Sequence, residues 1–78
     1  MDAAQVKALV ESHMKGCEVT VQGEGSSYDI TVVGEVFSGL RPVQRQQLVY
    51  GAISEQLADG SIHAVNIRTC TPDEWRSS

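Results

Sequence analysis

Two stretches in which apolar residues recur at every second position constrain the fold of this chain most. Residues 17–22 and 28–33 both place apolar side chains at every second position, which is the period of a strand with one buried face. The residues between them, 23–27, are glycine, serine and one glutamate, a composition typical of a turn. The pattern therefore predicts an antiparallel hairpin with one apolar face that other elements must cover.

A helix is expected before this hairpin. Asp2 can cap a first helical turn, and Gln5 stands three residues later, where its side chain can reach back to the cap. Gly16 is placed to end the helix in a left-handed conformation. The apolar residues that share one face at helical spacing are Val6, Leu9, Val10 and Met14.

A longer helix is expected after the hairpin. Pro42 suits the first helical position, because its missing N–H would have no partner there, and Asp59-Gly60 ends the helix. Before it, a short turn should tuck Val36 and Phe37 onto the core. The residues expected on the buried stripe of this helix are Val49, Ala52, Ile53 and Leu57, with Leu48 at the margin.

The C-terminal third predicts one more strand and a short helix. The strand covers residues 62–69 and continues to about Cys70, with His63 on the face that also carries Val65 and Ile67. Thr71-Pro72-Asp73-Glu74 then combines a threonine cap, a proline at the first position and a glutamate at the third, a strong helix start. We expect Trp75, in this last helix, to close one end of the core.

Together these elements predict one α+β domain over residues 1–78: a three-stranded sheet with the two major helices on the same face. The direction of the third strand does not follow from the sequence. A hydrophobic content of 41% argues against disorder. Neither a signal peptide nor an apolar run long enough to cross a membrane is visible, so a cytoplasmic location and no membrane partner are expected.

The charge and the reactive residues limit the possible functions. Ten acidic residues against six basic ones, a net charge of −4, disfavour a general nucleic-acid binder. Cys17 and Cys70 lack a redox or zinc spacing and are interpreted as structural thiols. His13 is near the end of the first helix, where the helix dipole favours it. The sequence contains no nucleophile elbow and no suggestive pair of carboxylates, so we expect a protein that is not an enzyme.

Four segments resemble the BolA family, and closest is its IbaG, or BolA-like, branch. They are Ile62-His63-Ala64-Val65 continuing to Thr71-Pro72-Asp73-Glu74-Trp75, Val43-Gln44-Arg45-Gln46-Gln47-Leu48-Val49-Tyr50, Gly23-Glu24-Gly25 before Tyr28, and Val33-Gly34-Glu35-Val36-Phe37. The resemblance covers nearly the whole chain in the same order. It implies a fold related to class II KH domains, with the order α-β-β-α-α-β-α.

The resemblance also implies a role in iron–sulfur cluster assembly or iron homeostasis with a monothiol glutaredoxin. The pair would share a 2Fe-2S cluster, with glutathione and a glutaredoxin cysteine as ligands on the partner's side. His63 falls on the family's C-terminal ligand position, so it is the expected metal and cluster ligand. The family's second ligand, a loop histidine or cysteine, would fall at Ser26 or Ser27, where hydroxyls replace the thiolate or imidazole that such clusters favour.

Two other functions stay open at this stage. Some members of the family are described as DNA-binding transcriptional regulators, and Arg41, Arg45 and Arg68 could form a face that binds a partner or, weakly, DNA. The two serines instead raise the possibility of a protein-interaction module without a metal. We expect the chain to be a monomer alone and a heterodimer with its partner.

Overall fold

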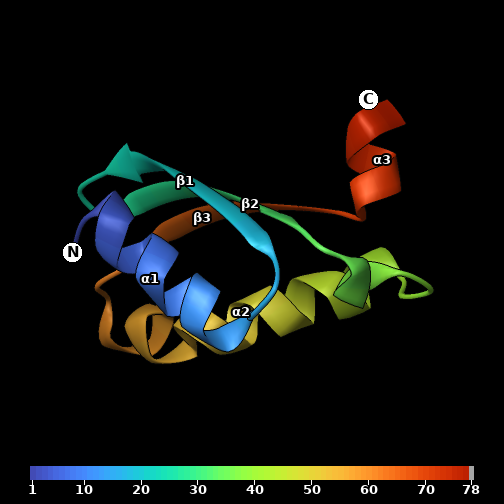
Figure 1. The fold of residues 1–78 in the computed structure, drawn as a ribbon. Helices are drawn as coiled ribbons and strands as arrows, with labels where there is room; N and C mark the ends of the chain where they lie inside the picture. Colours follow the sequence, from blue (N-terminus) through green and yellow to red (C-terminus); the bar gives the residue numbers. More distant parts are fainter. Residues whose placement is uncertain (78) are drawn as a thin grey trace.

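The computed structural model describes residues 1–77, and its elements follow the expected order (Figure 1). They are α1 (Ala3–His13), β1 (Glu18–Glu24), β2 (Ser27–Val33), the 3-10 turn η1 (Glu35–Phe37), α2 (Pro42–Asp59), β3 (Ala64–Cys70) and α3 (Pro72–Ser77). No helix in this part of the chain is both long and apolar enough to span a bilayer.

The three strands form one sheet in the order β1-β2-β3. β1 pairs antiparallel with β2, as the alternating pattern predicts, and the turn between them is tighter than expected because the strands extend to Glu24 and Ser27. β3 pairs parallel with β2. A parallel neighbour needs a crossover, and η1 with α2 supplies it. This answers the question of strand direction that the sequence left open.

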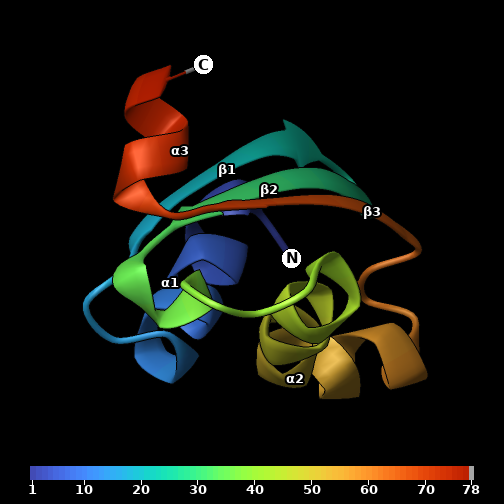
Figure 2. The same cartoon turned by 90° about the vertical axis from the view of Figure 1, so that its right-hand side faces the viewer.

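α1 and α2 cover the same face of the sheet (Figure 2), so the predicted α+β sandwich is confirmed. The cap of α1 is as predicted: the Asp2 carboxylate accepts from the Gln5 N–H at 2.9 Å, and the Gln5 side chain accepts from the Asp2 N–H at 3.0 Å. Gly60 ends α2 with a φ of 84°. The largest fully buried side chains are Phe37, Ile30, Ile53, Ile62, Val6, Val10, Val32 and Val49.

The third strand begins later than predicted. Residues 62 and 63 were expected in it, but β3 starts at Ala64. Ile62 is instead tied to the end of α2, since its N–H donates to the carbonyl of Gln56 at 3.1 Å and its side chain is buried. His63 therefore lies in the short connection before the strand, not within it.

α3 lies on the other side of the sheet from α1 and α2 (Figures 1 and 2). The expectation that Trp75 closes one end of the core is wrong, because Trp75 is 44% exposed. Its ring lies over the open face of the sheet, 5.7 Å from the Arg68 guanidinium. The other face of the sheet is already covered by buried side chains of α1, η1 and α2, among them Val10, Phe37 and Val49.

Candidate functional site

His63 is exposed and stands beside the turn between β1 and β2. Its backbone N–H donates to the carbonyl oxygen of Ser26 at 2.8 Å, and the N–H of Ala64 donates to the same oxygen at 3.1 Å. One carbonyl thus joins two segments that are far apart in the sequence. His63 is therefore both accessible and close to the turn between β1 and β2.

The buried side chain of Tyr28 anchors this turn. This side chain is only 2% exposed, and its hydroxyl lies 2.5 Å from the carbonyl oxygen of Gly25 and 2.6 Å from that of Met1. The single phenolic proton is shared between these two acceptors. Gly25 has a φ of 67°, a left-handed conformation that favours glycine. The turn that presents Ser26 to His63 is therefore anchored to both the hydrophobic core and the N-terminus.

The two serines lie in different elements, Ser26 in the turn and Ser27 at the start of β2. Ser27 pairs with Ala64, and both are exposed on the open face. The His63 ring lies beside the end of α2, where its Nε2 would be 3.5 Å from a Cβ atom at Gly60. There His63 lines a shallow hollow together with Leu57, Gly60 and Ile62. Of the two serines, Ser26 is the one whose carbonyl oxygen accepts from the His63 backbone.

The donor set around His63 is small. Among residues 1–77 no three histidine, cysteine or acidic side chains gather in a way that could hold a metal ion. Cys70 lies far from His63, because it pairs with Val33 at the opposite end of the sheet. Burial raises the pKa of the Cys17 thiol, which disfavours the thiolate form that binds metals. A metal or cluster bound by His63 would therefore need further ligands from outside residues 1–77 of this chain.

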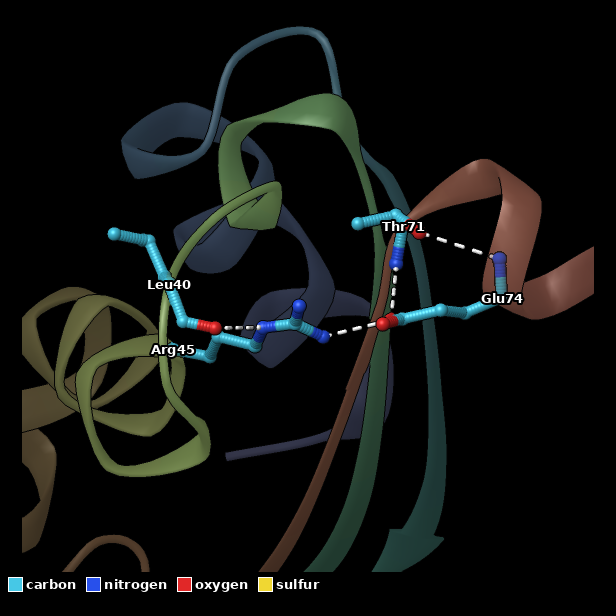
Figure 3. A network of polar contacts seen from close by, with 4 residues as sticks. All are labelled: Leu40, Arg45, Thr71 and Glu74. Carbon is cyan, nitrogen blue, oxygen red and sulfur yellow. Dashed lines mark hydrogen bonds and ion pairs between the residues drawn. The ribbon is translucent and has the colours of Figure 1, made fainter.

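The Arg45 side chain is mostly buried and bonds to groups of this same chain (Figure 3). It is 14% exposed, its Nη1 lies 2.7 Å from a Glu74 carboxylate oxygen, and its Nε donates to the carbonyl of Leu40 at 3.0 Å. The Arg45 guanidinium and the N–H of Thr71 hold the pKa of Glu74 below its usual range. This network ties α3 to the start of α2.

The other two predicted partner-binding arginines are exposed but separate. Arg41 immediately precedes α2, and Arg68 lies on the open face of β3 beside Trp75. Neither lies in the segment that holds His63. The role of Tyr28 was missed by sequence reasoning, because an inward-facing tyrosine in a strand gives no sign of which carbonyls its hydroxyl meets.

Comparisons with known proteins agree with the fold and show the family. The family model described as BolA-like protein matches residues 1–74. The acid stress protein IbaG of Escherichia coli K12 is 40% identical over 75 residues, which cover 96% of this chain and 89% of that one. The DNA-binding transcriptional regulator BolA of Vibrio cholerae is 41% identical over 71 residues, covering 91% of this chain and 63% of that one. Among solved structures, a bolA protein homologue from Coxiella burnetii superposes with a TM-score of 0.84 at 27% identity, covering 97% of each chain.

Proposed function

Since this chain belongs to the BolA family, we propose that it is an adaptor in iron–sulfur cluster assembly and iron homeostasis, not an enzyme. It docks on a monothiol glutaredoxin in the cytoplasm, and His63 becomes one ligand of a 2Fe-2S cluster that the two proteins share. Glutathione and a glutaredoxin cysteine provide the ligands on the partner's side. The cluster is cargo passing between proteins rather than a resident group of this chain.

One observation carries the proposal: an exposed imidazole in a backbone segment that is fixed on both sides. Ile62 anchors the segment to α2, and the Ser26 carbonyl holds His63 and Ala64. A ligand on such a fixed segment can meet an incoming cluster with little ordering of the chain on binding. Exposure of the imidazole leaves room for the partner protein that must complete the coordination.

The hydroxyl at Ser26 has a consequence for the complex. A serine oxygen is a harder ligand than imidazole or thiolate, so the cluster should be bound through His63 alone on this side and should be lost readily. Ser26→His places a second imidazole in the turn that binds the His63 backbone and should slow cluster loss. Ser27→His, on the open face, should do so less.

The test is co-expression of the chain with its host's monothiol glutaredoxin, followed by the visible absorption and circular dichroism spectra of the purified complex. His63→Ala should return the spectrum to that of the glutaredoxin homodimer, because the ligand set changes the electronic transitions of the cluster. His13→Ala is the matched control, since His13 is the only other histidine, and should leave the spectrum unchanged. A spectrum unaffected by His63→Ala contradicts the proposal.

A second candidate is a nucleic-acid-binding regulator, favoured by the similarity to the Vibrio cholerae protein with that name. Arg41 and Arg68 are exposed, but the net charge of −4 leaves few positive groups for phosphates. Binding should therefore be weak and should fall steeply with added salt. A fluorescence anisotropy titration of a labelled DNA duplex at two salt concentrations separates this function from the first.

A further inference from the structure

β3 is an edge strand, and its open side is unpaired among residues 1–77. The Ala64 N–H donates to the Ser26 carbonyl at 3.1 Å, and the Cys70 carbonyl accepts from the Gly34 N–H at 2.9 Å. In a parallel ladder only alternate residues bond to a given neighbour, so these two ends fix the even-numbered residues toward β2. The odd-numbered residues direct both their N–H and C=O groups away from the sheet. They are Val65, Ile67 and Thr69.

The features that usually protect a sheet edge are scarce on β3. It has seven residues in unbroken register with β2, without proline or bulge, and Arg68 is its single charged residue. The opposite edge, β1, differs: it carries Glu18 and Glu24 and includes Gly23 with a φ of 130°. Of the two edges of this sheet, β3 is therefore the one suited to accept another strand.

An apolar stripe on α2 accompanies the open edge. Val43 and Tyr50 are seven residues apart, two helical turns, in the part of α2 before the non-helical Ile53, and so share one side of the helix. Val43 is 67% and Tyr50 38% exposed, and Leu57 lines the hollow at the start of β3 with Ile62. The side of α2 toward α1 carries Gly51, where an added Cβ atom would lie 3.2 Å from His13 Nε2. The stripe therefore lies on the flank of α2 away from α1.

We propose that a second copy of this chain occupies this edge, with the two β3 strands antiparallel and Ile67 at the two-fold axis. This register pairs all the outward backbone groups: Ile67 with its own copy, and Val65 with Thr69 of the partner subunit. The result is one six-stranded sheet, and the two copies of α2 turn their apolar stripes toward each other beneath it.

Charge favours a second copy over β3 and not over β1. In the β3 pairing, Arg68 stands opposite Asn66 of the partner subunit, so no two like charges face each other directly. The same pairing of β1 about Val21 would set Glu18 directly against Glu24 of the partner subunit, twice by symmetry, which is destabilising. The interface between the two β3 strands is short, so the dimer should form only at high protein concentration. This dimer differs from the monomer that the sequence analysis predicts.

Sedimentation velocity of the full chain from low concentration up to about 1 mM, where a small interface of this kind is populated, tests the proposal. The mass should rise toward that of two chains. Thr69→Pro removes an outward N–H without a bond to β2, and Tyr50→Glu places a charge on the α2 stripe. Each should weaken association at least about tenfold, which corresponds to ~1.4 kcal/mol or more. Ser12→Glu, an equal charge change on exposed α1, should leave it unchanged.

Circular dichroism checks that each variant folds, and amide exchange gives an independent measurement. On dimerisation the amides of Val65, Ile67 and Thr69 should become protected from exchange. A mass of one chain at the highest concentration overturns the proposal, as does a dimer that survives Tyr50→Glu or weakens equally with Ser12→Glu. If Thr69→Pro does not fold, Tyr50→Glu and the exchange pattern decide the result.

Discussion

Replacing Tyr28 by phenylalanine tests how the candidate site is held together. The change removes only the hydroxyl that donates to the carbonyls of Gly25 and Met1. Gly25 and Met1 are both exposed, so water can replace the lost donor, and the cost should be near the mean for one hydrogen bond, about 1 kcal/mol. For a domain of this size that corresponds to a fall in Tm of about 4–8 °C.

The loss should be concentrated at the site. With the turn less firmly held, the His63 amide, which donates to Ser26, should exchange with solvent faster than amides in the middle of β2. Urea denaturation measures the stability, and hydrogen exchange followed by NMR measures the local effect. Tyr50→Phe is the control, because Tyr50 is an exposed residue of α2, and its loss of stability should stay within about 0.5 kcal/mol. Equal stability of Tyr28→Phe and wild type, with unchanged His63 exchange, would refute the anchoring role.

Three further predictions concern the site, the C-terminal helix and the core. His63→Ala should change the free energy of unfolding by no more than about 0.5 kcal/mol in urea, because the side chain is exposed; a larger loss would show a structural role. The ion pair with Arg45 lowers the pKa of Glu74, so its contribution to stability is complete above the usual glutamate range and is lost as pH falls through the lowered pKa. Trp75 fluorescence should report this acid release of α3, and a Glu74→Gln protein that shows the same transition would contradict it. Phe37→Ala, at a fully buried position, should cost about 3–5 kcal/mol in urea denaturation. A loss of unfolding free energy below about 1 kcal/mol would mean that the Phe37 side chain of η1 contributes little to the packing of the core.

The sequence alone determined the local elements, because their signals are carried by neighbouring residues. The Asp2 and Gln5 side chains cap α1 as expected, and Pro42 begins α2. The cap of α3 also follows prediction, since the Thr71 hydroxyl accepts from the Glu74 N–H at 3.2 Å. The recurrence of apolar residues at every second position predicted the hairpin, since each of its strands has only one apolar face to bury.

Family resemblance added His63 as the candidate ligand, but its surroundings depend on contacts between distant segments. The Ser26 carbonyl meets His63 across 37 positions of sequence, and no local pattern encodes that distance. The same holds for the Tyr28 hydroxyl and the Met1 carbonyl, which lie 27 positions apart.

Only the tertiary structure decided the direction of β3, the place of α3 and the environment of Trp75. Alternation predicts which residues of a strand share a face, but it is the same for parallel and antiparallel pairing. The crossover through α2 sets β3 parallel to β2 at the edge of the sheet. With the helix-covered face already filled, Trp75 lies against Arg68 on the open face. Sequence patterns report which surfaces a segment must bury, whereas the competition among segments for the same apolar face is resolved only when the chain packs.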